Sequence, residues 1–209
     1  MNASEPAFRV GFVPGVTPDK WARIWGERMP RRSLDLVPLG DRDGVALVRT
    51  GELAMCFVRL PVERDGLHLI PLYDEQPVVM VAKEHPVAAF DEIDVTDLAD
   101  EHLLQDPDTV PEWRDVATEV RDGSRYPVPE MSLREAVESV AADAGIVVVP
   151  MSLARLHHRK DVAFRPVTGV EESPVGLAWL REPLGDHDDP DIEVFIGIIR
   201  GRTPRSSRG

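Results

Sequence analysis

The order of strand-like and helix-like segments over residues 1–61 narrows the possible folds more than any other feature of the sequence. Three strand-like runs occupy residues 10–13, 33–40 and 54–61. Between the first two runs, apolar residues recur at the spacing of one helix face, at Trp21, Ile24, Trp25 and Met29. This pattern predicts a helix with Thr17 as its N-cap and Pro18 at its first position, and residues 41–53 predict a second helix ended by Gly51. A β-α-β-α-β order implies a parallel sheet with right-handed crossovers.

The rest of the chain adds strands of mixed character. Further extended runs lie at residues 66–76, 77–86, 146–150, 161–167 and 174–182. The run at 146–150 holds four consecutive β-branched residues, which is typical of a central parallel strand. The acidic stretch at 91–116 predicts a short helix at 95–99, a strand near 102–105 and then a loop or helical turn.

Two later helices carry their own start and stop signals. In the segment 129–145, Ser132 can cap a helix, Glu135 completes an S-x-x-E capping box and Gly145 ends the helix. A final helix is predicted over residues 188–201, with Asp189 as its cap and apolar residues on its inner side. Its last turn leads into the polar, arginine-containing residues 201–209, which predict a disordered basic tail.

Charge and cysteine content exclude several classes of protein. The 37 acidic and 24 basic residues give a net charge of −13, which disfavours nucleic acid and anionic membranes as partners of the globular part. The chain begins without the features of a signal peptide and has no apolar run of the ~20 residues that a membrane span needs. The single cysteine, Cys56, lies in an apolar run and predicts a buried thiol in a reducing compartment. We therefore predict a cytoplasmic protein.

The sequence contains little that supports catalysis. It lacks the G-x-S-x-G and phosphate-loop motifs, and the glycines of "GFVPG" do not match a dinucleotide fingerprint. His157 and His158 are adjacent and diverge on a helix, so they do not readily share a metal. The acidic run at 186–191 lacks the spacing of a calcium loop. No metal, cofactor or catalytic residue is predicted.

Binding residues are expected at the carboxyl ends of the strands, where open α/β sheets hold their ligands. These positions are Pro14, Gly15, Val16 and Thr17, Asp41 and Arg42, Arg59 to Pro61, Gln105 and Asp106, Ser132, and Pro150 to Ser152. Arg59 carries a planar cation suited to a carboxylate or phosphate, and a salt bridge with one of the many acids is an equal alternative. The turn at 14–17 offers one side-chain hydroxyl, that of Thr17, among apolar groups. It therefore suits a ligand with an apolar body better than a bare phosphate.

Four segments together resemble the effector-binding domain of LysR-type transcriptional regulators. They are "FRVGFVPG", "VALVRTGELAMCFVRLPV", "LIPLYDEQPVVMVAKEHPVA" and "EAVESVAADAGIVVVPMSLAR", and the resemblance covers residues 8 to 200. It implies an α/β fold of the type 2 periplasmic-binding-protein kind, with mainly parallel sheets, crossover helices and two lobes. Lobe I would comprise residues 8–80 and 165–200, and lobe II residues 81–164, with hinge strands near 77–83 and 161–167. Asp143 stands where the family has a glycine-containing turn.

The resemblance also implies a function and a site. It implies a non-enzymatic sensor of a small, carboxylate-bearing metabolite that modulates transcription. The ligand would lie between the lobes, on Pro14, Gly15, Val16, Thr17, Arg59, Gln105, Ser132 and Pro150. The family's N-terminal winged helix-turn-helix has no counterpart in these residues, so the globular part is not expected to bind DNA.

Several alternatives remain open from the sequence. The first is an enzyme on the same fold, such as a dehydratase of aromatic-acid or menaquinone-precursor metabolism. A homodimer is expected, and the "WARIW" helix is one surface for it, although Trp21 and Trp25 also fit a core role. Arg200, Arg202, Arg205 and Arg208 in the tail are a weak candidate for nucleic-acid contact.

Overall fold

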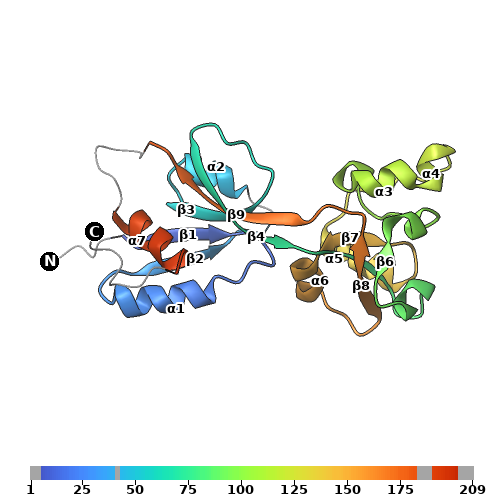
Figure 1. Ribbon diagram of the computed structural model, residues 1–209, viewed down its shortest axis with the longest axis horizontal. Helices are drawn as coiled ribbons and strands as arrows, with labels where there is room; N and C mark the ends of the chain where they lie inside the picture. The colour runs from blue at the N-terminus through green and yellow to red at the C-terminus, as the bar shows by residue number, and fades with distance from the viewer. Residues whose placement is uncertain (1–5, 41–42, 183–189, 202–209) are drawn as a thin grey trace. The chain divides into compact units, whose positions relative to one another are not determined.

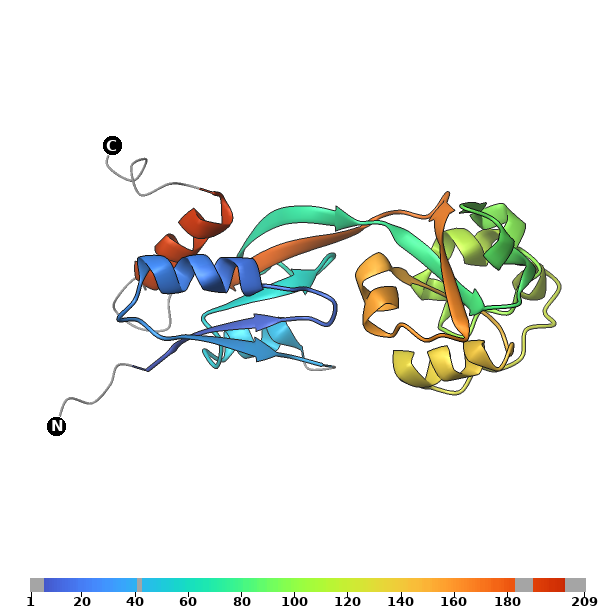
Figure 2. The ribbon, with the colours of Figure 1, turned by 90° about the horizontal axis from the view of Figure 1, so that it is seen from below.

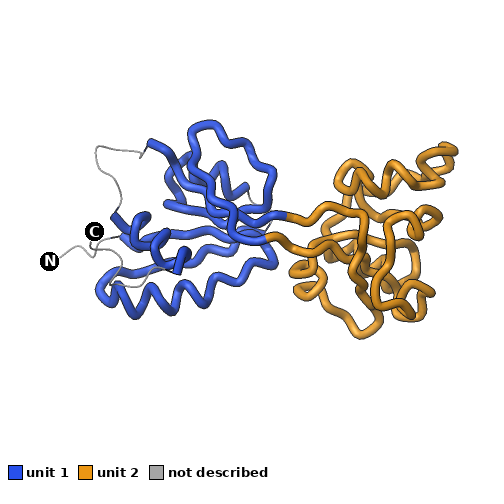
Figure 3. Tube along the Cα trace, in the orientation of Figure 1, with its two compact units in different colours: residues 1–73, 174–209 blue, residues 74–173 orange. Residues whose placement is uncertain are grey.

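The chain divides into two compact units, and each is described by itself. The structure is a computed structural model, and it describes residues 6–40, 43–182 and 190–201. Unit 1 comprises Met1–Tyr73 and Pro174–Gly209, and unit 2 comprises Asp74–Ser173 (Figure 3). Asp41, Arg42, Asp189, most of the acidic run 186–191, and the tail arginines 202, 205 and 208 lie outside the described residues.

Unit 1 is built on a five-stranded sheet of mixed direction. The strand order is β2-β1-β3-β9-β4. The strands are β1 (Phe8–Phe12), β2 (Leu34–Pro38), β3 (Met55–Arg59), β4 (Leu67–Glu75) and β9 (Ser173–Leu180). The β-α-β-α-β prediction for the first 61 residues is confirmed, because β1 pairs in parallel with both β2 and β3. However, β9 runs antiparallel to β3, with Met55 opposite Trp179, so the prediction of a parallel sheet is wrong for this pair of strands.

Helices cover both faces of the unit 1 sheet. They are α1 (Asp19–Arg28), α2 (Gly44–Arg49) and α7 (Pro190–Ile199), with α1 and α7 on one face and α2 on the other (Figures 1 and 2). The alternation of side chains along β3 produces these two layers. Met55 and Phe57 pack in the core under α1 and α7, whereas Cys56 and Val58 pack under α2.

The two tryptophans of "WARIW" belong to the core of unit 1. Trp25 stacks on Phe8 with ring centroids 5.0 Å apart, and Trp21 stacks on Phe57 at 4.9 Å. Phe195 of α7 meets the Phe8 and Phe57 rings edge-on. Trp21 and Trp25 are 7% and 1% exposed, so their rings are used in folding and offer no dimer surface.

The start of α1 differs from the prediction by one residue. Pro18, not Thr17, is the N-cap residue, because the Pro18 carbonyl accepts the first helical hydrogen bonds, from the N–H groups of Trp21 (2.9 Å) and Ala22 (3.1 Å). Proline has no side-chain acceptor, so this helix start lacks a side-chain cap. In contrast, Asp43 caps α2 through its carboxylate, which accepts hydrogen bonds from Val45 N and Ala46 N at 2.9 and 3.1 Å.

Unit 2 holds a second sheet, of four strands in the order β6-β8-β5-β7. The strands are β5 (Pro77–Ala82), β6 (Ile93–Asp94), β7 (Val147–Pro150) and β8 (Val162–Thr168). The segments predicted as hinge strands are β5 and β8, which pair antiparallel inside this sheet, with Met80 opposite Phe164. Both strands thus belong to unit 2. The two units divide at 73/74 and 173/174, whereas the boundaries expected for the lobes are at 80/81 and 164/165.

The prediction that residues 146–150 form a central parallel strand is wrong. β7 is the last strand in the sheet order and runs antiparallel to β5, with Val78 opposite Val149. It is nevertheless buried, because helices cover both faces and the segment from His102 to Leu104 runs along its outer edge. That segment forms a parallel bridge between Leu103 and Ile146, which corresponds to the strand predicted near 102–105.

Alternating side chains again separate two cores in unit 2. The helical segments are α3 (Pro111–Val116), α4 (Thr118–Arg121), α5 (Leu133–Ala141), α6 (Met151–Leu156) and the 3₁₀ turns η1 (Pro86–Ala89), η2 (Val95–Leu98) and η3 (Pro107–Thr109). Val78 and Met80 of β5 pack with α5 and α6 on one face. Val79 and Val81 pack on the other face with α3, η1 and η2, around the fully buried Trp113.

The start of α5 follows its sequence signal, whereas the helix ends at Ala141 and not at Gly145 as predicted. The capping box is confirmed: Ser132 Oγ accepts from Glu135 N at 3.4 Å, and Glu135 Oε2 accepts from Ser132 N at 2.8 Å. Beyond the helix, Asp143 takes the left-handed conformation, with φ at 60°. Gly145 follows, and a Cβ there would collide with the His102 carbonyl oxygen. The glycine is therefore needed where the chain turns into β7.

Candidate functional site

A cavity of about 850 Å³ lies within unit 2 and is the candidate binding site. Ligand sites of small-molecule-binding proteins generally measure about 300–1,000 Å³. Three parts of unit 2 form its walls. They are the loop at Leu104 to Thr109, the segment from Arg125 to Met131, and the facing surface of α5 and β7 with Leu133, Ala136, Val147 and Val149.

The inner surface of this cavity is apolar. Val147 and Val149 lie on the same face of β7, and Leu104 and Ala136 are also buried beside them. Met131 and Leu133 at the start of α5 are half-buried against the same core. Such a surface favours the apolar part of a ligand, because its burial removes apolar area from water.

One wall is an extended segment, residues 126–131, that makes no hydrogen bonds to the described part of the chain. Pro127 and Pro129 have no N–H to donate, and each restricts the residue before it to extended conformations. Tyr126 at the start of the segment is 78% exposed. The wall is thus held only by its two ends and by side-chain contact with the cavity.

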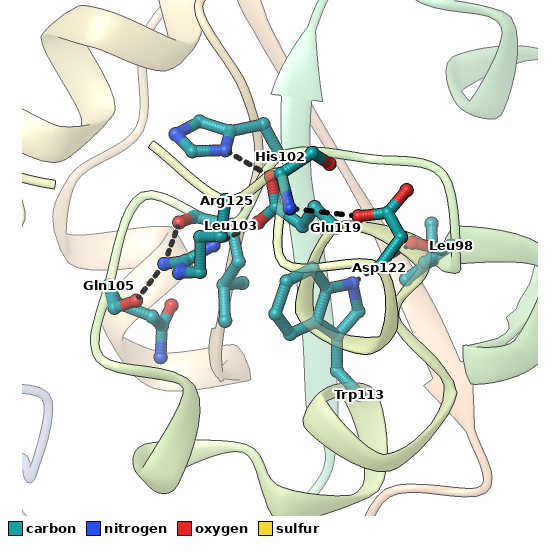
Figure 4. A network of polar contacts seen from close by, with 9 residues as sticks. Leu98, His102, Leu103, Gln105, Trp113, Glu119, Asp122 and Arg125 are labelled. Atoms are coloured by element: carbon teal, nitrogen blue, oxygen red, sulfur yellow. Dashed lines mark hydrogen bonds and ion pairs between the residues drawn. The ribbon is translucent and has the colours of Figure 1, made fainter. Parts of the chain in front are cut away.

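Arg125 anchors the first end of this wall (Figure 4). One of its terminal nitrogens donates to the carbonyl oxygens of Leu103 at 2.8 Å and Gln105 at 3.0 Å, and the other pairs with Glu119. Glu119 also contacts His102 Nδ1, at 2.6 Å. The guanidinium therefore binds the wall to the 103–105 loop.

The second end is anchored by the capping box of α5. Ser132 Oγ donates to Glu135 Oε2 at 2.7 Å, in addition to the two backbone contacts of the box. The Ser132 hydroxyl and backbone N–H hold the pKa of Glu135 below its usual value. Ser132 therefore serves the helix start.

Gln105, another predicted site residue, lines the cavity but is committed to the fold. Its Oε1 accepts from Val148 N at 2.9 Å, which satisfies the outer edge of β7 in place of a further strand. Its Nε2 donates to Thr109 Oγ1 at 2.9 Å, and Thr109 Oγ1 donates to Asp106 O at 2.6 Å. The Asp106 carboxylate accepts from Asp108 N at 2.9 Å. These polar groups stabilise the loop from Leu104 to Thr109, which forms another wall of the cavity.

Two polar side chains on the cavity wall remain without a hydrogen bond or ion pair within the described residues. They are the phenol of Tyr126 and the carboxylate of Glu130. Sequence reasoning missed Arg125 and Tyr126. The signal available for them is the pattern "RYPVPE", because two alternate prolines predict an extended segment.

Unit 1 brings the remaining predicted residues to one edge of its sheet. The turn at 14–17 follows β1, and Arg59 ends the neighbouring parallel strand β3; Val13 N donates to Phe57 O at 3.3 Å and ties the two together. Gly15 has φ at 87°, which the tight turn requires. The Thr17 side chain is exposed and Arg59 already has an interaction partner.

The last predicted residue, Pro150, ends β7 in unit 2 and follows Val149 of the cavity. It lies opposite Pro77 in the pairing of β7 with β5. The structure thus brings Gln105, Ser132 and Pro150 to the region of one cavity, and Pro14 to Thr17 and Arg59 to one sheet edge.

The described residues show no arrangement for a metal or a membrane. They contain no cluster of three or more His, Cys, Asp and Glu side chains placed to hold a metal ion. Among the same residues, none of the helices has the length and apolar character needed to cross a bilayer. The Cys56 thiol is fully buried, and burial, aided by the Asp43 carboxylate, raises its pKa to about 12.

A two-unit α/β protein with a ligand-sized cavity in one unit has the features of a small-molecule-binding domain. The model of the LysR substrate binding domain matches residues 3–204, and the chain belongs to this family. Among curated relatives, a probable hydrogen peroxide-inducible genes activator of Mycobacterium avium is 31% identical over 152 residues, which cover 69% of this chain and 49% of that protein. The chain spans about half the length of the first of these relatives.

Solved structures support the same fold. The BenM effector binding domain, determined with its effector benzoate, has a TM-score of 0.70 at 19% identity and covers 96% of both chains. A Corynebacterium glutamicum OxyR C206 mutant has a TM-score of 0.68 at 25% identity, covering 96% of this chain and 65% of that one. The expected fold of LysR effector-binding domains is confirmed.

Proposed function

We propose that this domain binds a small-molecule effector in the unit 2 cavity and thereby controls transcription as part of a LysR-type regulator. The observation that carries the proposal is the cavity wall at residues 126–131. This wall lacks hydrogen bonds to the described chain, yet both of its ends are firmly anchored. A ligand that fills the cavity can therefore order the wall without first breaking its contacts. Family membership supplies the regulatory role.

The lining of the cavity defines the chemistry of the effector. Its floor is apolar, and the one cation of its lining, Arg125, already donates to two carbonyls and a carboxylate. We therefore propose an effector with an apolar or aromatic body and a group that hydrogen-bonds to the Tyr126 phenol. The carboxylate implied by the family resemblance stays a prediction, and in that prediction its cation is Arg59.

The proposal includes no catalytic step. The mycobacterial relative named above is a probable gene activator. The acids that line the cavity, Asp106 and Glu130, have no histidine beside them among the lining residues. With this role, we propose that the domain acts in the cytoplasm. A homodimer remains a prediction, to be checked by sedimentation of the purified chain.

Thermal unfolding of the chain with a panel of small aromatic and aliphatic metabolites tests the proposal, because a ligand that binds the native state alone raises its stability. A ligand that shifts the melting temperature should lose at least about tenfold in affinity in Tyr126→Ala. Phe90→Ala is the matched control, since Phe90 is an exposed aromatic residue of unit 2 outside the cavity lining. The proposal fails if no compound shifts the transition, or if both variants weaken binding equally.

The residues of unit 1 require a separate test. Thr17→Val removes the one side-chain hydroxyl of the 14–17 turn, and Arg59→Ala removes the cation at the end of β3. If these residues contact the effector, both variants weaken binding while the melting temperature without ligand changes little for Thr17→Val. Unchanged affinity in both would restrict the site to unit 2.

A further inference from the structure

A second cavity of unit 2 has an unusual set of lining residues. Its volume is about 560 Å³, and it shares no lining residue with the candidate effector site. Five of its eight lining residues are basic or histidine: Lys83, His158, Arg159, Lys160 and Arg165. The other three are Ala88, Val162 and Ala163, so no carboxylate lines this cavity. In a chain with a net charge of −13, this arrangement concentrates positive charge in one place.

The distribution of lysines also shows that positive charge is concentrated at this cavity. The whole sequence contains three lysines, Lys20, Lys83 and Lys160, and two of them line this cavity. The side chains of these two take part in no hydrogen bond or ion pair with the described residues. Most cations of this chain are arginines, so two lysines in one cavity are an unusual concentration. Lysine binds phosphate as a compact point charge with three hydrogen-bond donors.

The backbone brings these residues together from distant parts of the sequence. β5 and β8 pair antiparallel, and their last pair is Ala82 opposite Val162. Lys83 N donates to Asp161 O at 3.0 Å, so the loop after β5 lies beside the loop before β8. Lys160 precedes that contact by one residue, and Arg165 follows on β8. The position of the cluster is therefore fixed by the sheet.

Arg165 is held in place without being neutralised. Its guanidinium donates to the carbonyl oxygens of Ala88 and Phe90, and to Phe164 O at 2.8 Å. All three partners are uncharged, and no described carboxylate forms an ion pair with Arg165. Its positive charge is thus preorganised at the cavity, with the side-chain entropy already lost in folding.

The carboxylate of Asp161 borders the cluster, and it is committed to a single arginine. Asp161 accepts from Arg159 Nε at 2.9 Å and from an Arg159 terminal nitrogen at 2.8 Å. This contact lowers the pKa of Asp161 and raises that of Arg159. Lys83, Lys160 and Arg165 have no comparable partner among the described residues, so the cavity retains a net positive charge.

An adjoining cavity of about 800 Å³ shows why the smaller one is selected. It shares Lys83, Arg159 and Lys160 but is also lined by Glu84, Asp143 and Asp161. The three carboxylates of the 800 Å³ cavity repel an anion. The 560 Å³ cavity has Arg165 in its lining and no carboxylate. We propose that the 560 Å³ cavity is a binding site for a small phosphate-bearing anion, with Lys83 and Lys160 contacting the phosphate oxygens and Arg165 supplying fixed positive charge.

Isothermal titration of the full chain with inorganic pyrophosphate tests this site. The double variant Lys83→Gln/Lys160→Gln is expected to weaken binding by at least about tenfold, whereas Lys20→Gln, the remaining lysine, leaves the affinity within about twofold. Raising the salt from about 50 to about 200 mM should weaken binding several-fold in the unmodified chain, because the lysines are exposed to solvent. Both lysines are exposed, so a circular dichroism melt should show an unchanged fold.

Three results would overturn the proposal. They are no binding of pyrophosphate at about 10 mM, equal weakening by Lys20→Gln, and binding of a short DNA duplex through Lys83 and Lys160 with no binding of pyrophosphate. The outcome does not depend on the effector proposal, because Tyr126→Ala alters the other cavity and should leave pyrophosphate binding unchanged.

Discussion

The guanidinium of Arg125 lies over the ring of Trp113, with 5.5 Å between its central carbon and the ring centroid. Trp113 is fully buried and donates from its indole nitrogen to Leu98 O at 2.9 Å (Figure 4). The same guanidinium holds the loop and the wall of the effector cavity. The core of unit 2 and its proposed binding wall are thus connected through one side chain.

Arg125→Ala is therefore expected to destabilise unit 2 by about 2 kcal/mol, because Glu119 loses its arginine partner in a largely buried position and keeps only the contact with His102. Urea unfolding measures this loss. Hydrogen exchange should also become faster at the N–H groups of Leu104 and Ile146, which join the loop to the start of β7. Arg114→Ala is the control, since Arg114 is the partly exposed arginine of α3 and pairs with exposed acids. Equal destabilisation by the two variants would contradict the anchoring role.

The capping box of α5 gives a pH-dependent prediction. The pKa of Glu135 is lowered from its ordinary value of 4.5 by the Ser132 hydroxyl and N–H. A lowered pKa in the folded state adds stability above the ordinary value, and this stability is lost as the pH falls through the folded pKa. Ser132→Ala should cost about 1 kcal/mol at pH 7, and the difference from the unmodified chain should shrink below about pH 4.5.

The control for this prediction is Glu135→Gln, which keeps a hydrogen-bonding side chain at that position without its titration. Thermal unfolding between pH 3 and pH 7 should then show a constant effect of Ser132→Ala when it is combined with Glu135→Gln. A pH-independent effect of Ser132→Ala with Glu135 intact would show that the carboxylate contributes nothing to the cap.

Asp143 is expected to be tolerant of one substitution and sensitive to another. It has φ at 60°, a conformation that aspartate adopts more readily than β-branched residues do. Asp143→Gly should leave stability unchanged or raise it by up to about 1 kcal/mol, and Asp143→Val should lower it by about 1–2 kcal/mol. Urea midpoints measure both. A destabilising glycine would show that the Asp143 side chain, not its backbone conformation, is what matters.

Cys56 is expected to be chemically inert in the folded chain. The thiol is fully buried, and its pKa is raised to about 12, so almost no thiolate forms at pH 8. Ellman's reagent should react with it only after the chain is unfolded in guanidinium, and hydrogen peroxide should not change the melting temperature. Rapid modification of the native protein would contradict this expectation.

Local signals in the sequence determined much of the secondary structure of this protein. The apolar spacing of Trp21 and Trp25, the capping box at Ser132 and the β-α-β-α-β order each act over a few residues, so they can be read directly. The family motifs added the fold, and the family model confirms it over residues 3–204. Of the predicted site residues, Gln105 lines the unit 2 cavity, and its side chain supports the loop there.

Only the tertiary structure decided which strands pair and which side chains meet. An apolar run such as residues 146–150 encodes burial but not its partner, and packing placed β7 at a sheet edge, antiparallel to β5. The turn at "VGFVPGVT" could be predicted, whereas the meeting of Arg125 with the 103–105 loop, and of Lys83 with Asp161 through their backbones, could not. Such contacts join residues far apart in the chain, and they form because buried polar groups need partners and cores need filling across the whole unit.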